Sequence, residues 1–290
     1  MLKSSYNIAA GIVLYNPDVK RLQENIKAIK KQVDTIILVE NGSSNTDYLQ
    51  QLDITDTIIL TNDSNKGIAF ALNQICKYCY DKKIPWVITL DQDSIVSPNI
   101  IQILEEYIGD NVGIICPKII DRNFKRKEDD YNYDVKEINW CITSASLTNV
   151  AAWKKIGGFD NSMFIDWVDL DFCIALRKNG YKILQTMKTQ ILHELGENSR
   201  IIHFRGKQIY LLNRPSTRYY FVERNNIYLG RKWDHISLKR KLFETLETLF
   251  FVIFYEKHKW SNFIAMIKGI YHGFKMPIEF RSIEKQFGSI

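Results

Sequence analysis

Two carboxylates separated by a single residue follow a short apolar segment. Asp91 and Asp93 come directly after residues 86–90 and enclose Gln92. Side chains two residues apart point the same way in an extended chain, so both carboxylates would leave a strand on one side. Paired carboxylate oxygens suit a hard divalent cation that also accepts phosphate oxygens. A solvated turn or a helix cap is the alternative, and the preceding buried strand favours the ligand site.

A second acidic cluster places three carboxylates within six residues. Asp166, Asp169 and Asp171 stand at the start of a predicted helix, beside Phe164 and Trp167. Acidic side chains commonly cap the first turn of a helix, where the helix dipole favours them. Three caps at one helix start would be unusual. We therefore expect one of these carboxylates to accept a proton from a substrate hydroxyl.

A histidine completes the set of residues with chemical potential. His193 follows a further predicted strand and lies downstream of both acidic clusters. A single histidine is more often structural than a ligand. Its position after a strand nevertheless makes it a candidate nitrogen ligand for a carboxylate-rich metal site.

The first half of the chain alternates short apolar runs with helical patterns. Strands are predicted at residues 7–14, 35–39, 57–60 and 86–90, with helices at 19–31 and 67–80. This alternation predicts a parallel sheet whose loops gather at the carboxyl ends of the strands. The polar loops around Gly42 and Gly67 would then lie beside Asp91, where they can hold a nucleotide.

Further elements are predicted along the rest of the chain. They are a helix at 98–107, a strand at 112–116, a solvated loop at 121–134, a strand at 139–147, helices at 150–156 and 169–179, and a strand at 181–186. Beyond residue 216 strand signals are scarce, and helices are predicted at 218–231 and 237–273. We place a soft domain boundary near residues 200–215.

Charge is unevenly distributed along the 290 residues. Residues 1–199 carry 22 basic against 26 acidic side chains, whereas residues 200–290 carry 17 against 7. The composition, with 46% hydrophobic residues, is that of a packed globular protein. A basic C-terminal part indicates an anionic partner, either a phosphorylated ligand, a membrane surface or nucleic acid. The five scattered cysteines favour a reducing cytoplasm.

Six motifs in order resemble family 2 glycosyltransferases of GT-A fold, and more closely the dTDP-rhamnosyltransferase-like branch that builds bacterial O-antigens and capsules. The motifs are VLYNP at 13–17, VENGS at 39–43, NKGIA at 65–69 with Asn73, LDQDS at 90–94, the segment 164–171, and His193. The resemblance covers residues 6–230. It implies an α/β fold with a catalytic domain at 1–215, divided into a nucleotide-sugar half at 1–95 and an acceptor half at 96–215. A basic helical region would follow at 216–290.

The resemblance also implies roles for individual residues. Base and ribose would be held by the loops carrying Tyr15, Glu40 and Asn41, where Glu-Asn replaces the usual acidic pair. The remaining donor-side residues are Asn65, Lys66, Gly67, Asn73, Asp91 and Gln92. Asp91, Asp93 and His193 would hold Mg²⁺ or Mn²⁺. Asp169 matches the catalytic base, with Asp166 and Asp171 as alternatives.

The implied reaction is an inverting transfer of a sugar. An acceptor hydroxyl would attack the anomeric carbon while Asp169 takes its proton. L-Rhamnose from dTDP-rhamnose is the expected donor sugar, with a UDP-sugar as the alternative. The acceptor would be a lipid-linked molecule or an oligosaccharide in polysaccharide biosynthesis.

The C-terminal region combines basic and aromatic residues. Its apolar run at 249–255 is too short to span a membrane, which needs about 20 residues. We expect a peripheral contact with the cytoplasmic face of a bacterial plasma membrane, and the alternative is packing on the catalytic domain or in a homodimer. Trp167, Arg218 and Arg224 are weaker candidates for acceptor or diphosphate contacts.

Two other classes of protein compete with this interpretation. An Asp-nucleophile phosphatase would use Asp91, but its pattern requires Thr or Val where Ile95 stands, and it leaves the cluster at Asp169 unexplained. A non-enzymatic basic module would bind membranes or nucleic acid in a salt-dependent way without turnover. Nucleic acid is the least expected partner, because the motifs point to a nucleotide sugar.

Overall fold

The structure is a computed structural model that describes residues 6–121, 133–193, 200–204, 207–211, 214–278 and 281–283. The chain divides into two compact units, which are described separately. The first, called the sheet unit here, comprises Met1–Phe164, Val168–His193 and Arg281–Ile290. The second, the helical unit, comprises Ile165–Trp167 and Glu194–Phe280. The chain therefore passes from one unit to the other earlier than the expected boundary at residue 215.

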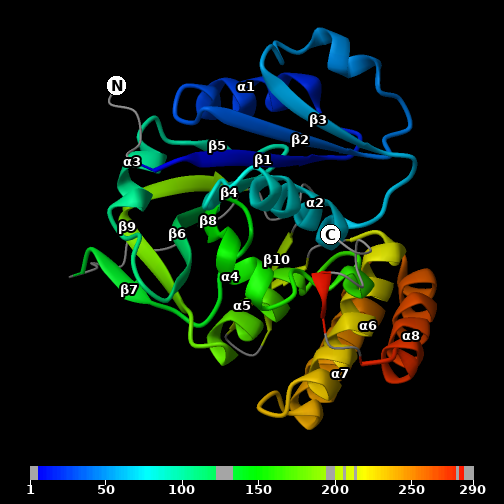
Figure 1. Cartoon of the computed structure of the whole chain (residues 1–290). Helices are drawn as coiled ribbons and strands as arrows, with labels where there is room; N and C mark the ends of the chain where they lie inside the picture. Colours follow the sequence, from blue (N-terminus) through cyan, green and yellow to red (C-terminus); the bar gives the residue numbers. More distant parts are fainter. Residues whose placement is uncertain are drawn as a thin grey trace. The chain divides into compact units, whose positions relative to one another are not determined.

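The sheet unit begins with four parallel strands in the order β3-β2-β1-β4 (Figure 1). They are β1 (Ile8–Leu14), β2 (Thr35–Asn41), β3 (Thr57–Asn62) and β4 (Trp86–Asp91). All seven residues of β1 are buried, as expected for a parallel strand covered on both faces. The helices α1 (Val19–Lys30) and α2 (Ile68–Asp81) connect these strands. The prediction for this half is confirmed.

The rest of the sheet is mixed. β8 (Ser146–Asn149) pairs antiparallel with β4, and the order continues through β6 (Val112–Asp121), β9 (Lys182–His193) and β5 (Ile95–Val96). The short β7 (Val135–Glu137) pairs with β9. Helices α3 (Ile100–Glu105), α4 (Val150–Lys155) and α5 (Val168–Lys178) complete the unit, with 3-10 turns at Asp47–Gln51 and Asn161–Met163.

The strand predicted at 139–147 is mostly wrong. Only residues 146–149 form a strand, because the backbone turns at Ala145, which has a φ of 58°. The Ala145 N–H donates to the carbonyl of Thr89, and the Thr89 hydroxyl donates to the carbonyl of Thr143 at 2.7 Å. Most of the loop predicted at 121–134 lies outside the described residues.

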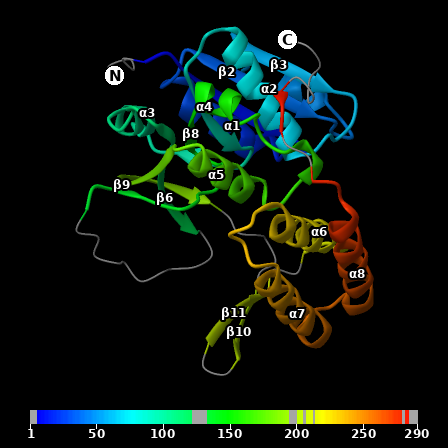
Figure 2. The ribbon, with the colours of Figure 1, turned by 60° about the horizontal axis from the view of Figure 1, so that its bottom comes forward.

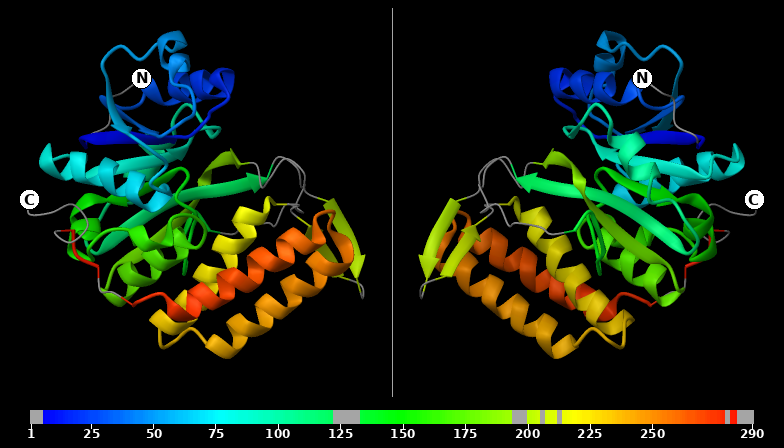
Figure 3. Two further views of the ribbon diagram at one scale, coloured as in Figure 1. Left: turned by 90° about the vertical axis from the view of Figure 1, so that its right-hand side faces the viewer. Right: turned by 90° about the vertical axis from the view of Figure 1, so that its left-hand side faces the viewer.

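The helical unit contains α6 (Ser216–Lys232), α7 (Leu238–Tyr255) and α8 (Lys259–Lys275), with the hairpin β10 (Arg200–Phe204) and β11 (Lys207–Leu211) (Figure 2). The three helices lie side by side in Figure 3.

The single helix predicted at 237–273 is wrong. Helix α7 ends at Tyr255, and α8 begins at Lys259. Between them, buried Glu256 accepts hydrogen bonds from the Tyr219 hydroxyl and from Asn262 Nδ2.

Candidate functional site

The turn after β4 holds the carboxylate pair. Asn25 Nδ2 donates to the Asp91 carbonyl at 2.6 Å, and Ser94 N–H donates to the same carbonyl at 3.1 Å. The Asp91 N–H donates to Ser144 Oγ at 3.2 Å, and the Ser94 and Ser144 hydroxyls lie 2.7 Å apart. Ser94 and Ser144 are buried, whereas Asp91 and Asp93 are partly exposed. The buried side chains of Asn25 and Ser144 therefore fix the backbone of the turn, while Asp91 and Asp93 remain partly exposed.

Gln92 links this turn to the loop after β1. The Tyr15 N–H donates to Gln92 Oε1 at 2.9 Å, and Gln92 Nε2 donates back to the Tyr15 carbonyl at 3.4 Å. The Tyr15 side chain is exposed. Gln92 thus holds the backbone of Tyr15 and leaves its side chain exposed.

The structure brings His193 to the same sheet edge through its backbone. β5 and β9 are antiparallel, with Ile95 opposite Leu192. The backbone of His193, the next residue of β9, therefore lies beside the turn that carries Asp93. The side chain of His193 lies outside the described part of the structure. Among the described side chains, no group of three His, Cys, Asp or Glu residues surrounds a common metal position. Two half-exposed carboxylates fit a hard cation that takes its other ligands from phosphate oxygens and water.

Glu40 shapes the loop after β2. It is buried, and its carboxylate accepts the Ser43 N–H at 2.9 Å and the Gly42 N–H at 3.2 Å. The Tyr48 hydroxyl lies 3.5 Å from Glu40 Oε1, and burial together with this negative charge raises the pKa of Tyr48 to about 12. Glu40 therefore acts on the site by fixing the backbone of its own loop.

Asn41 ties the loops after β2 and β3 together. Its Oδ1 accepts from Asn62 Nδ2 at 2.9 Å and from the Lys66 N–H at 3.1 Å, and its Nδ2 donates to Asn65 Oδ1 at 3.2 Å. A Cβ on Gly42, whose φ is 77°, would lie 2.2 Å from the carbonyl carbon of Ser64. Glycine is required there because the two loops approach at backbone distance.

Gly67 sits against the segment that carries the second acidic cluster. Its φ is 86°, and a Cβ would lie 2.6 Å from the carbonyl oxygen of Phe164. The Ile68 N–H donates to that oxygen at 2.7 Å. Lys66, the preceding residue, is exposed and pairs with Asp63 at 2.7 Å.

Asn73 is fully buried beneath this contact. Its Oδ1 accepts from Trp153 Nε1 and from the Phe159 N–H, both at 2.8 Å. Its Nδ2 donates to the Phe159 carbonyl at 2.9 Å and to Asn161 Oδ1 at 2.8 Å. The expectation that Asn73 touches a donor is therefore corrected, since no part of it reaches solvent; it positions the segment that leads to Phe164.

The three carboxylates of the acidic cluster occupy different environments. Asp171 is fully buried and forms an ion pair with Arg281, which also donates to the Gly158 carbonyl at 2.7 Å. This pair fixes residues 281–283 within the sheet unit. Because the carboxylate of Asp171 is sealed from solvent, it is removed from the candidates for a base that meets a substrate.

Asp169 stands in the first turn of α5 and is partly exposed. One of its oxygens accepts the N–H of Leu170 at 2.8 Å. A carboxylate in this position is stabilised by the helix N-terminus and still faces solvent. Asp169 therefore combines accessibility with a fixed position.

Asp166 belongs to the helical unit and is engaged by Arg218. Arg218 Nη2 donates to Asp166 Oδ1 at 2.6 Å. The φ values of Asp166 and Trp167 are both 64°, a region that side chains rarely adopt, and Asn225 Nδ2 holds the strained segment by donating to the carbonyls of Ile165 and Asp166. Accepting a proton would weaken the charge-assisted bond to Arg218, so Asp166 is a poorer base candidate than Asp169.

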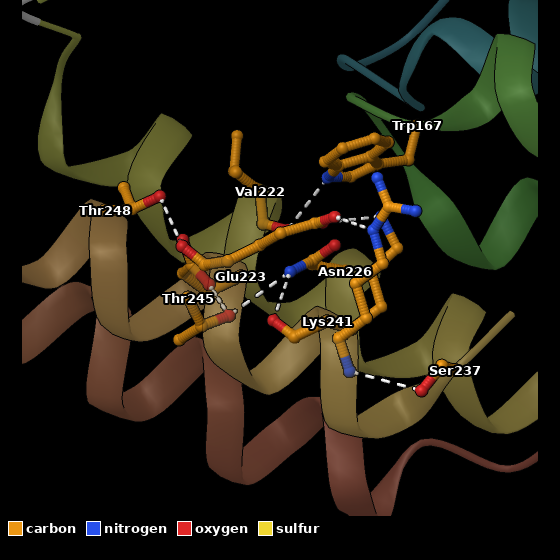
Figure 4. Close-up of polar contacts among 10 residues, drawn as sticks. Trp167, Val222, Glu223, Asn226, Ser237, Lys241, Thr245 and Thr248 are labelled. Atoms are coloured by element: carbon orange, nitrogen blue, oxygen red, sulfur yellow. Dashed lines mark hydrogen bonds and ion pairs between the residues drawn. The ribbon is translucent and has the colours of Figure 1, made fainter. Parts of the chain in front are cut away.

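Trp167 is held by α6 and α7. Its Nε1 donates to the Val222 carbonyl at 3.0 Å, and Lys241 Nζ lies 4.3 Å from the centre of its ring (Figure 4). Lys241 also pairs with Glu244 at 2.9 Å. Sequence analysis missed Lys241 and Asn225, because their relation to Trp167 depends on how distant helices pack and no local pattern marks it.

Arg224 lies on the same helix as Arg218. Its guanidinium donates to Asn225 Oδ1 at 3.0 Å and stands 4.9 Å from the centre of the Phe221 ring. It therefore braces Asn225, which holds the segment at Asp166.

The chain is similar to several known proteins. The dTDP-rhamnosyl transferase RfbF of Shigella flexneri is 29% identical over 259 residues, which cover 84% of this chain and 86% of that protein. Among solved structures, TarS residues 1–349 of S. aureus match with a TM-score of 0.58 at 12% identity, covering 92% of this chain and 80% of that one.

GalNAc-T7, crystallised with UDP, GalNAc and Mn²⁺, matches with a TM-score of 0.61 at 12% identity. The match covers 98% of this chain and 56% of GalNAc-T7, so this chain spans little more than half of that protein. These likenesses show the GT-A fold. The sequence profile of glycosyl transferase family 2 matches residues 10–175. Since that match covers more than half of the chain, the chain belongs to glycosyl transferase family 2 and is a glycosyltransferase.

Proposed function

We propose that the protein transfers L-rhamnose from dTDP-L-rhamnose to a lipid-linked or oligosaccharide acceptor with inversion at the anomeric carbon. The observation that carries the reaction is the fixed turn at Asp91 and Asp93, at the carboxyl edge of the parallel strands. The likeness to the Shigella flexneri dTDP-rhamnosyl transferase supports the donor. Bacterial O-antigen or capsule biosynthesis would use such a transfer.

The base in this proposal is Asp169. Its carboxylate accepts the proton of the acceptor hydroxyl while the glycosidic bond forms and the bond to the nucleoside diphosphate breaks, a role worth roughly 10²–10⁴ in rate. Asp91, Asp93 and His193 would hold Mg²⁺ or Mn²⁺. When bound, the cation neutralises charge on the departing diphosphate.

The donor would lie along the loops after β1, β2 and β3. Tyr15 offers an exposed ring to the thymine base, and Lys66 can exchange Asp63 for a phosphate oxygen. Asn65 and Gly67 belong to the loop after β3, which Asn41 holds in shape, while Glu40 holds the loop after β2. Trp167, Arg218 and Arg224 are proposed to serve the acceptor or the diphosphate.

A lipid-linked acceptor would place the enzyme on the cytoplasmic face of the plasma membrane. Among the described helices, none is both long enough and apolar enough to cross a bilayer. The alternative is that the exposed surface of the helical unit forms a homodimer. Vesicle flotation tests the membrane contact, and sedimentation tests the homodimer.

A panel of nucleotides with Mn²⁺ tests the donor. Thermal stabilisation of the full chain by dTDP at concentrations where UDP and GDP have no effect would support dTDP-rhamnose. A preference for UDP would instead establish the alternative, a family 2 transferase with a UDP-sugar donor. Transfer of rhamnose from dTDP-L-rhamnose, followed by the configuration of the product, completes the test.

A further inference from the structure

Helix α8 has apolar residues on two opposite faces. One face packs on α6 through glycines, since a Cβ on Gly269 would lie 2.4 Å from the Tyr220 carbonyl oxygen and one on Gly273 would lie 2.5 Å from that of Arg224. Met266 and Asn262, also buried, belong to this inner face. The close helix contact fixes the rotation of α8 about its own axis.

The outer face of α8 carries a continuous line of large side chains. The residues recur every three or four positions, so they lie along one side of the helix. They are Trp260, Ile264, Ile267, Tyr271 and Phe274, with exposed fractions from 43% for Phe274 to 78% for Trp260. The line extends about 21 Å along the helix. We call it the α8 stripe.

Charge along α8 is of one sign. The helix contains Lys259, Lys268 and Lys275 and no Asp or Glu. Lys268 and Lys275 are exposed, and Lys275 Nζ lies 4.4 Å from the centre of the Tyr271 ring. The long aliphatic stems of lysines at the border of an apolar face allow the amines to reach toward anionic groups.

We propose that the α8 stripe binds the surface of a bilayer containing anionic phospholipids. The stripe enters the boundary between headgroups and acyl chains, and Lys268 and Lys275 meet lipid phosphates. A second copy of the chain is disfavoured as the occupant, because a symmetric pairing of two α8 helices would bring lysines of one copy against lysines of the other. This inference deepens the proposed function, since a lipid-linked acceptor is met at a membrane.

Flotation of the full chain with vesicles tests the stripe. We expect binding to vesicles of phosphatidylcholine with phosphatidylglycerol and at most weak binding to phosphatidylcholine alone. The double variant Trp260→Ser/Ile267→Ser should weaken binding on the order of 100-fold, because two large side chains no longer enter the lipid. The matched control Trp140→Ser/Ile59→Ser removes exposed side chains of the same types from the sheet unit and should bind as the parent does.

The charges are tested separately. Lys268→Glu/Lys275→Glu should weaken binding to anionic vesicles by at least about tenfold. Lys20→Glu/Lys27→Glu changes two exposed lysines with the same seven-residue spacing on α1 and should leave vesicle binding unchanged. All four variants alter exposed side chains, and their melting temperatures check that they fold.

Three results would overturn the proposal. They are no binding of the parent to anionic vesicles, equal binding to neutral and anionic vesicles, and a dimer in sedimentation experiments that Trp260→Ser/Ile267→Ser dissociates. Calorimetry of dTDP binding with Mn²⁺ in the absence of vesicles distinguishes the two proposals. Nucleotide binding without vesicle binding would refute only the proposal that the α8 stripe binds a bilayer. Vesicle binding without dTDP binding would refute only the proposal that the donor is a dTDP-sugar.

Discussion

The carbonyl oxygen of Phe164 accepts the N–H of Ile68 at 2.7 Å, and Gly67 leaves the space in which that bond forms. The contact joins the loop after β3 to the segment that precedes Asp169. Phe164 itself has a φ of 61°, so the backbone on its side of the contact is strained, whereas Gly67 adopts its positive φ without strain. The distance between the loop after β3 and the start of α5 is thereby fixed within the sheet unit.

Replacement of Gly67 by alanine should therefore disturb both stability and donor binding. Gly67 has a φ of 86° and a ψ of 163°, a conformation that essentially only glycine adopts, so a Cβ there costs about 1–3 kcal/mol, and the overlap with Phe164 adds to that cost. Gly180→Ala is the matched control, because Gly180 has a φ of 82° and a Cβ placed on it would have no atom within 4 Å. Chemical denaturation and dTDP affinity should both show the larger loss for Gly67→Ala. Equal losses would show that the contact with Phe164 contributes nothing.

Asp169 and Asp171 should respond differently to the same substitution. Asp169→Asn removes the proposed base and should lower transfer by roughly 10²–10⁴ while the melting temperature and dTDP affinity stay unchanged. Asp171→Asn leaves Arg281 buried without its counter-ion and should cost about 3–5 kcal/mol of stability. Undiminished turnover by Asp169→Asn would assign the proton transfer to another group, with Asp166 next in order.

Metal-dependent binding should depend on Asp93. Asp93→Ala is expected to abolish the gain in dTDP affinity that Mn²⁺ provides, because a carboxylate ligand is lost. Asp63→Ala removes an exposed carboxylate of the loop after β3 and should keep the metal dependence. Calorimetry with and without Mn²⁺ measures both, and an unaltered metal effect in Asp93→Ala would rule Asp93 out as a ligand.

The buried Glu223 should make stability depend on pH. Burial raises the pKa of Glu223, and the Thr245 hydroxyl donates to its carboxylate (Figure 4). The folded state then binds the proton more tightly than the unfolded state, whose pKa is about 4.3. Stability should fall as pH rises from about 4.3 through the raised pKa of the folded state.

Glu223→Gln should flatten this part of the pH profile and match or exceed the parent in stability at pH 7. Glu247→Gln, on the exposed side of α7, should retain the slope of the parent. Thermal denaturation from pH 4 to pH 8 provides the comparison. A slope that persists in Glu223→Gln would show that another group carries it.

Some of the fold could be predicted from the sequence because local patterns determine it. The strands β1 to β4 are continuous apolar runs that parallel pairing buries on both faces, so their ends were predicted within about two residues. The break between α7 and α8 was not predicted. It depends on Glu256, which reads locally as one more helix former and finds its partners on α6 and α8.

The sequence indicated which polar residues gather near the candidate site, but it did not separate those that are exposed there from those that are buried and hold it in place. Asp91, Asp93 and Asp169 are partly exposed as expected. Asn73 and Asp171 look equally suited to ligands in the sequence, yet their partners Trp153 and Arg281 are 80 and 110 residues away. Such pairings arise only when the chain has folded, and they decide which polar side chains brace the site instead of facing it.

The glycine contact between α8 and α6 has a structural consequence. The backbone of Arg224 abuts Gly273, while the next residue, Asn225, grips the carbonyls at Ile165 and Asp166. Two adjacent residues of α6 thus contact α8 on one side and the segment at Asp166 on the other. Within the helical unit, the packing of α8 and the conformation of the segment that carries Trp167 therefore depend on the same part of α6.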